Sequence, residues 1–123
     1  AEESSARLIR IKLLRNKPAD ARDLIVKYLR VYPSSDQAAE LAYQCAQSFR
    51  GAQNYKESVK WFDKVIVDFP TSGYREPALY WAGWCLGKQG VKGSKNQYFA
   101  KYRELFPNGE WSDAIAKSER QAN

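Results

Sequence analysis

Residues 37–70 read QAAELAYQCAQSFRGAQNYKESVKWFDKVIVDFP, and residues 74–107 read YREPALYWAGWCLGKQGVKGSKNQYFAKYRELFP. The two stretches align at a step of 37 residues, and each ends in an aromatic residue followed by proline. The same kind of pair also occurs one step earlier, which gives Tyr32-Pro33, Phe69-Pro70 and Phe106-Pro107. A period between about 20 and 50 residues is typical of repeat arrays whose units bury their apolar faces against one another. The sequence therefore predicts a stack of similar units.

Apolar residues within each repeat follow the spacing of a helix. Within 37–50 they recur every three or four residues, at Ala38, Leu41, Ala42, Cys45, Ala46 and Phe49. A polar turn at 50–54 separates this stretch from a second helical stretch. The second stretch ends at Phe69, because the residue before a proline is pushed away from the helical region. No stretch rich in Val, Ile and Thr alternates as a strand would. Each repeat is therefore predicted to be a pair of helices.

This pattern predicts a single all-α domain over residues 1–123, an α-solenoid of about three helical hairpins with a C-terminal capping helix. The hairpins are expected at about 3–33, 35–70 and 72–107, and the polar capping helix at about 109–120. In the first unit Ala21, Tyr28 and Pro33 fit the repeat. Its opening helix aligns poorly, and its internal turn looks a few residues shorter than the others.

The charge of the chain is uneven. The net charge is +6, with +4 in residues 1–33, +4 in residues 71–107 and −1 in each of the two remaining segments. We interpret the basic excess as a solvated helical surface, with nucleic-acid binding as the alternative. The apolar runs are far shorter than the roughly 20 residues that cross a bilayer.

The sequence predicts no catalysis, no cofactor and no metal. The chain has no His, no C-x-x-C spacing and no phosphate-binding G-x-x-x-x-G-K-[ST] loop. It therefore lacks the residues that usually form a Ser-His-Asp triad, a structural zinc site or a nucleotide-binding loop. Cys45 and Cys85 fall inside apolar helical patterns and are expected to be buried free thiols, with a disulfide between them as the alternative.

The repeats resemble those of the tetratricopeptide repeat (TPR) family. The middle unit fits the pattern of small and aromatic residues at Cys45, Ala46, Phe49, Tyr55, Ser58, Phe62, Val65 and Pro70. The third unit fits at Ala82, Gly83, Leu86, Gly90, Phe99 and Pro107. It departs at Lys92 and Lys95, where an aromatic residue and an alanine are usual, so its inner turn is expected to differ.

The unit length points to a subgroup. The commonest TPR has 34 residues, whereas these units have 37, and small polar residues follow each proline. Such units are similar to those of bacterial cell-envelope TPR proteins, including the outer-membrane barrel assembly lipoprotein and the Tol-Pal-associated coordinator protein. The resemblance implies a periplasmic or cell-envelope location, with the cytoplasm as the alternative.

The resemblance also implies where a partner would bind, because in this family the first helices of the hairpins line a concave groove. Carried onto this chain, the groove comprises Glu40, Tyr43, Gln47, Arg50, Tyr80, Trp84, Lys88 and Lys117. Aromatic side chains followed by Arg or Lys suit recognition of a peptide. Tyr43 and Gln47 stand where chaperone-tail-binding modules carry Lys and Asn, which argues against that ligand. Trp61 and Trp81 are expected to pack between repeats, and Phe62 and Phe99 to lie in the core.

We therefore predict a non-catalytic scaffold that binds a protein or peptide partner in its groove, as part of a larger bacterial envelope assembly. Two alternatives remain: the helical-repeat portion of a larger envelope enzyme, and a basic nucleic-acid-binding module. Self-association is left open.

Overall fold

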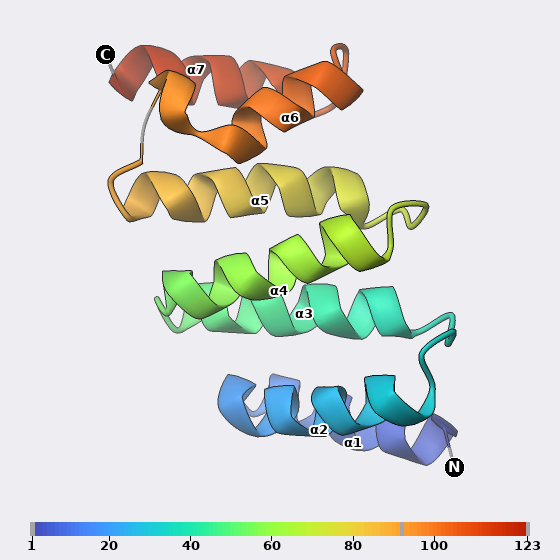
Figure 1. Ribbon diagram of the computed structural model, residues 1–123. Coiled ribbons are helices and arrows are strands. Elements are labelled where there is room, and N and C mark those ends of the chain that lie inside the picture. Colours follow the sequence, from blue (N-terminus) through green and yellow to red (C-terminus); the bar gives the residue numbers. More distant parts are fainter. Residues whose placement is uncertain (1, 92, 123) are drawn as a thin grey trace.

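The computed structural model describes residues 2–91 and 93–122 (Figure 1). Within these residues the chain forms seven α-helices, one short 3₁₀ turn and no strand. The elements are α1 (Glu2–Leu14), α2 (Pro18–Val31), α3 (Ala38–Gly51), α4 (Tyr55–Asp68), α5 (Arg75–Lys88), the 3₁₀ turn η1 (Gly93–Lys95), α6 (Gln97–Leu105) and α7 (Ser112–Ala122). Successive helices pack against one another, which confirms the predicted all-α solenoid.

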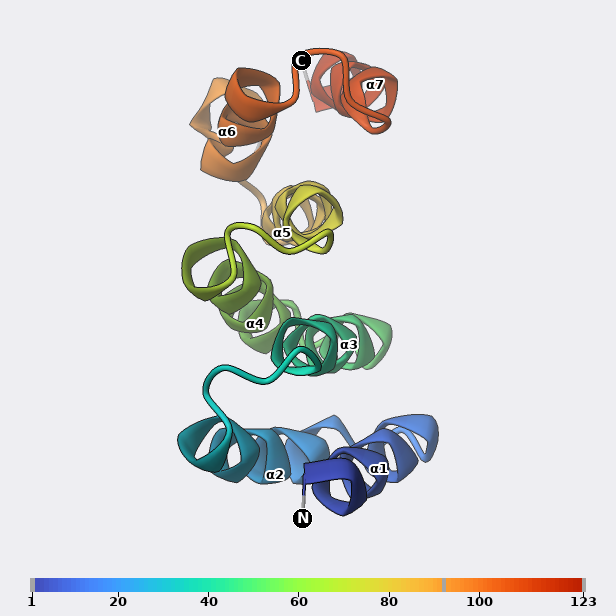
Figure 2. The ribbon, with the colours of Figure 1, turned by 90° about the vertical axis from the view of Figure 1, so that its right-hand side faces the viewer.

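The helices form two columns. Figure 2 shows α1, α3, α5 and α7 on one side of the molecule and α2, α4 and α6 on the other. In the same view α1 and α7 reach further outward than α5, so the column of first helices is concave. Stacked hairpins produce such a surface because each unit is rotated slightly with respect to the one before it.

The backbone repeats the 37-residue step of the sequence inside each hairpin. Asn16, Gln53 and Gly90 lie one step apart, and each adopts a positive φ, of 56°, 62° and 96° respectively. Glycine adopts this conformation without steric cost, whereas Asn and Gln do so less readily. The connections α1–α2 and α3–α4 each span three residues, at 15–17 and 52–54. The expectation of a shorter first turn is therefore wrong for the middle hairpin, and the first turn is shorter only than that of the third hairpin, where α5 ends at Lys88 and α6 begins at Gln97.

The aromatic residue before each proline ends a second helix with the same geometry. Tyr32, Phe69 and Phe106 have φ of −125°, −128° and −132°, with ψ near 60° in each case. Each donates its backbone N–H to the carbonyl oxygen four residues earlier, and the proline then blocks the helical conformation.

The first helix is also in register with the repeat. The Tyr28 hydroxyl donates to Glu2 Oε1 at 2.9 Å, and the Tyr102 hydroxyl donates to Glu76 Oε2 at 2.7 Å. Both members of the second pair lie 74 residues, or two steps, after those of the first. The poor alignment of the opening helix thus reflects its residue types and not its position in the repeat.

The third hairpin departs from the others in its inner connection. The α6 helix has nine residues, against fourteen in α4, and η1 precedes it. Lys95, one of the two departures from the pattern, lies in η1, and Lys92 lies outside the described residues. Asn96 then caps α6 by accepting a hydrogen bond from the Phe99 N–H at 3.3 Å.

The core lies between the two columns. Phe62 and Phe99 are buried, as predicted, and Trp61 is buried as well. Gly83 allows α5 and α6 to approach closely, because a Cβ at this position would overlap the ring of Phe99.

Two buried polar side chains satisfy the carbonyl groups of the small residues where the helices cross. Ser58 Oγ donates to the carbonyl oxygen of Ala46 at 2.7 Å, and Asn96 Nδ2 donates to that of Gly83 at 2.8 Å. Ala46 and Gly83 are one repeat apart. A donor from the second helix, or from the residue that caps it, therefore reaches the same carbonyl in both hairpins, as buried polar groups require.

Candidate functional site

The site predicted from the sequence lies on the first helices. On α3, Tyr43, Gln47 and Arg50 follow one another at spacings of four and three, which places them on one face. Gln47 Nε2 donates to the Tyr43 hydroxyl at 2.9 Å, and Arg50 Nε donates to Gln47 Oε1 at 2.6 Å. The amide of Gln47 thus positions the guanidinium of Arg50.

The guanidinium of Arg50 crosses from α3 to the aromatic side chains of α5. Its central carbon lies 4.0 Å from the ring centre of Trp81 and 5.3 Å from that of Trp84. Lys88 Nζ lies 5.0 Å from the ring centre of Trp84. Cations over the faces of Trp are attracted by the quadrupole of the ring. These contacts join two neighbouring hairpins through partly exposed side chains.

Tyr80 contacts its neighbour Trp81, with 4.9 Å between the ring centres, and extends the aromatic contacts toward α7. Its ring stacks on Trp111 at 4.5 Å and 12°, and lies 6.1 Å from the ring of Phe99. Burial raises the pKa of the Tyr80 hydroxyl. Tyr80 therefore connects α5 to the start of α7.

The predicted groove did not include Trp81, which lies beside Arg50. It packs between hairpins, and its partner there is the guanidinium of Arg50. Trp81, Trp84 and Lys88 are separated by three and four residues, a signal that could have placed them together on one helical face. Adjacent helical residues such as Tyr80 and Trp81 point about 100° apart, so two consecutive residues of α5 contact different neighbouring helices.

Glu40 and Lys117 lie apart from the aromatic cluster. Glu40 Oε1 is 3.5 Å from Arg10 NH2 on α1, so its carboxylate is paired across the first two hairpins. Lys117 is exposed on α7 and forms no ion pair with the described residues.

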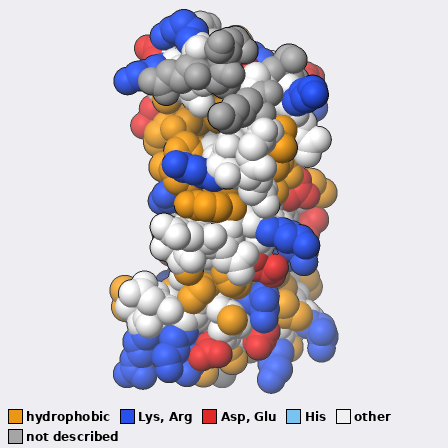
Figure 3. Space-filling model, turned by 90° about the vertical axis from the view of Figure 1, so that its left-hand side faces the viewer, with side chains coloured by type: hydrophobic (Ala, Val, Ile, Leu, Met, Phe, Trp, Pro, Cys, Tyr) orange, Lys and Arg blue, Asp and Glu red, His pale blue; other side chains and the backbone are white. Residues whose placement is uncertain are grey.

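The cluster carries positive charge without an adjacent carboxylate. Within residues 2–91 and 93–122, neither Arg50 nor Lys88 has a carboxylate at ion-pair distance. Figure 3 shows the side of the molecule that lies on the left in Figure 1. Hydrophobic side chains lie halfway along this side with Lys or Arg beside them, and further basic side chains cover α1 and α2. We call Arg50, Trp81, Trp84 and Lys88 the aromatic–cation cluster. Its chemistry suits a segment that brings both apolar and acidic groups.

The cysteines take no part in this cluster. Cys45 and Cys85 are free and buried, and Cys85 Sγ lies 3.6 Å from Ser58 Oγ. Burial raises the pKa of Cys45 to about 12 and also raises that of Cys85. Across the described part of the chain, no three His, Cys, Asp or Glu side chains gather as metal ligands would. Nor does any helix described there have the length and hydropathy to span a membrane.

Comparison with known families finds a match in the third hairpin. Residues 77–109 match the family model described as Tetratricopeptide repeat. The match begins in α5 and runs through α6, so the third hairpin carries a TPR-like repeat despite its longer inner connection. This type of repeat is typical of protein–protein interaction scaffolds. No curated protein matches the chain.

Proposed function

We propose that the protein is a non-catalytic scaffold that binds a peptide segment or partner helix on its concave face, with the aromatic–cation cluster as the main contact. The partner supplies an acidic side chain or a terminal carboxylate to Arg50 or Lys88 and an apolar side chain to the rings of Trp81 and Trp84. Tyr43 and Gln47 extend the contact along α3.

The observation that carries this proposal is the position of Arg50. Its guanidinium is held by Gln47 at 2.6 Å and by the face of Trp81 at 4.0 Å, and no described carboxylate neutralises it. An arginine oriented in this way loses little rotamer entropy when it binds a carboxylate. Aromatic and Arg residues in the centre of a surface are also those that most often dominate binding.

Affinity selection and a set of variants test the proposal. Peptides are selected from a random library on the immobilised domain, and their affinity is measured by fluorescence anisotropy. We expect Arg50→Ala and Trp84→Ala each to weaken binding about tenfold or more, as hot-spot residues do. Lys56→Ala is the matched control, because Lys56 is exposed on α4 in the other column. Selected peptides that bind all these variants equally would contradict the proposed site.

We further propose that the scaffold serves a larger assembly of the bacterial cell envelope. This rests on the resemblance of its 37-residue units, with their small polar linkers after proline, to those of envelope TPR proteins. Cell fractionation tests this part: the full gene product is expected with the periplasmic or membrane fraction, and a purely cytoplasmic product would contradict it.

The basic N-terminal hairpin favours nucleic-acid binding as a second candidate, since residues 1–33 carry a net charge of +4. The dependence of affinity on salt separates the two candidates. Contacts to several phosphates give a steep fall in log affinity with log salt, whereas one or two ion pairs in a peptide site give a shallow one.

A further inference from the structure

The outer face of the first hairpin presents positions that the third hairpin buries. Ile11 lies two steps before Cys85, which reaches Ser58 on α4 at 3.6 Å. Leu24 lies two steps before Tyr98, whose hydroxyl donates to Asp63 on α4 at 2.8 Å. In the third hairpin, therefore, these two positions pack against the second helix of the preceding hairpin.

No described element covers the corresponding face of the first hairpin. Leu8 lies two steps before the fully buried Ala82, yet its own exposed fraction is 45%, and that of Ile11 is 37%. These side chains are also larger than the Ala82 and Cys85 that occupy the equivalent positions. The face thus exposes branched aliphatic side chains at a place where the repeat packs a helix.

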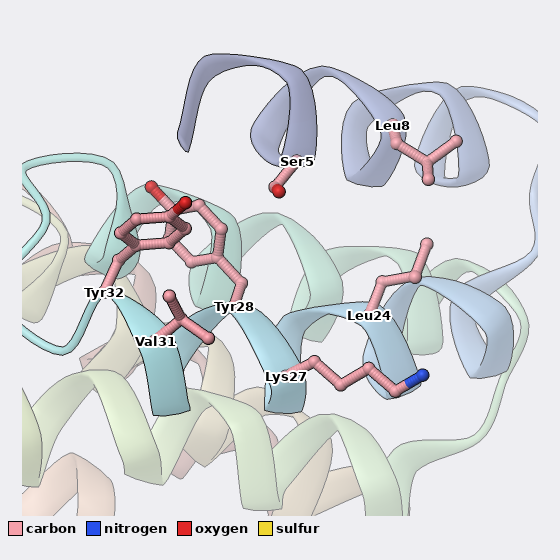
Figure 4. A pocket seen from close by; sticks show the side chains of 7 residues that line it. All are labelled: Ser5, Leu8, Leu24, Lys27, Tyr28, Val31 and Tyr32. Atoms are coloured by element: carbon pink, nitrogen blue, oxygen red, sulfur yellow. The ribbon is translucent and has the colours of Figure 1, made fainter. Parts of the chain in front are cut away.

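A cavity of about 210 Å³ lies on this face between α1 and α2. Figure 4 shows Leu8 of α1 and Leu24 of α2 beside it, with Val31 and Tyr28 further along α2. The volume is several times the roughly 30 Å³ share of one liquid water molecule. A side chain from a neighbouring helix fits such a space.

Basic side chains lie beside the apolar residues and outnumber the exposed Asp20 and Asp23 of α2. Lys27 lines the cavity. Arg7 lies four residues before Ile11 on α1, and Arg15 lies four residues after it in the turn that follows α1. All three are exposed, and none forms an ion pair within the described chain. A second copy of this face would bring two such basic rims together, which is unfavourable.

We propose that this face is a second interaction surface, which binds an amphipathic helix of a partner protein whose apolar stripe is flanked by acidic residues. The helix packs on α1 and reaches α2, as α4 packs on α5 and reaches Tyr98 of α6. Its apolar side chains contact Leu8, Ile11 and Leu24 and enter the cavity, and its carboxylates pair with Lys27, Arg7 and Arg15.

Two synthetic helical peptides test the proposal on the intact protein. Both carry Leu at positions i, i+3, i+4 and i+7, and one has Glu and the other Lys at the remaining positions. We expect the Glu peptide to bind saturably and about tenfold or more tightly than the Lys peptide, because only the first complements the basic rim. We expect Leu8→Asp and Lys27→Glu each to weaken its binding about tenfold or more, and Lys56→Ala, on the exposed side of α4, to leave it within about twofold.

The Leu8→Asp and Lys27→Glu variants separate this surface from the concave site, because neither residue belongs to the aromatic–cation cluster. Leu8 is nearly half exposed and Lys27 is exposed, so both variants are expected to keep the wild-type circular dichroism spectrum and melting temperature. Equal affinity for the two peptides, or full binding by folded Leu8→Asp and Lys27→Glu, overturns the proposal. Sedimentation equilibrium supplies a further check: a wild-type dimer that Leu8→Asp converts to monomer would make a second copy the occupant and also overturn it.

Discussion

The Tyr102 hydroxyl donates to Glu76 Oε2 at 2.7 Å and accepts the backbone N–H of Trp111 at 2.8 Å. One side chain of α6 thereby holds both the beginning of α5 and the approach to α7. Tyr28 and Glu2 repeat this contact in the first hairpin, with the Ser35 hydroxyl beside them at 2.6 Å from that of Tyr28. The middle hairpin has Val65 and Ala39 at these positions and relies on apolar packing there.

Replacement of Tyr102 by Phe is expected to lower the free energy of unfolding by about 1–3 kcal/mol, because the Trp111 N–H and the Glu76 carboxylate lose a partner in a partly buried place. Urea unfolding followed by tryptophan fluorescence measures the change. Tyr32→Phe is the control, since the Tyr32 hydroxyl bonds to no described residue. An equal effect of the two substitutions would contradict the role of the Tyr102 hydroxyl.

Two glycines of α5 are expected to respond to alanine in opposite directions. A Cβ at Gly87 meets no atom within 4 Å, so Gly87→Ala should stabilise the protein by about 0.5–1 kcal/mol through helix propensity. A Cβ at Gly83 would overlap the ring of buried Phe99, so Gly83→Ala should destabilise it by about 1–3 kcal/mol. Chemical denaturation of both variants tests the close approach of α5 and α6, and the same sign for both would refute it.

Phe62→Ala is expected to cost about 3–5 kcal/mol, because the fully buried ring leaves a cavity between the columns. Val67→Ala, on the same helix with an exposed fraction of 64%, should change stability by less than about 0.5 kcal/mol. Thermal unfolding of both variants provides the measurement. A melting temperature unaffected by Phe62→Ala would show that the register assigned to the middle hairpin is wrong.

Stability is expected to fall as the solution becomes alkaline. Burial, with the Glu76 carboxylate, raises the pKa of Tyr102 to about 12, against about 10 in an unfolded chain. Between these two values the unfolded state loses a proton that the folded state retains, so stability declines as pH rises and is fully present below pH 10. Urea midpoints measured from pH 8 to pH 12 test this trend. Tyr102→Phe should show a shallower decline, and an identical slope would exclude this tyrosine as a contributor.

The two thiols are expected to react slowly with an aromatic disulfide reagent in the native protein. Cys45 and Cys85 are buried, and their raised pKa values leave little thiolate near neutral pH. Two equivalents should react rapidly in denaturant, and the native rate should follow the population of unfolded protein. Reaction of the native protein at the rate of free cysteine would show that α3 and α5 do not enclose these groups.

The sequence by itself determined the helical hairpins and the stacked repeat. Aromatic–proline pairs at a fixed step end each second helix, and apolar residues at helical spacing define the buried face of each helix. Both signals lie within a single repeat, so the sequence alone reveals them. The burial of Phe62, Phe99 and the cysteines followed from the same pattern.

The tertiary structure decided which side chains meet between repeats. It placed Trp81 beside Arg50 and turned Tyr80 toward Trp111, because neighbouring residues of a helix point about 100° apart and the contact depends on the rotation of the adjacent hairpin. It also brought α1 into register through Tyr28 and Glu2, although the residue types of α1 hide the repeat. The sequence pattern could not predict that Leu8 and Ile11 are exposed. Periodicity identifies an apolar helix face, but only the packing shows whether another helix covers that face.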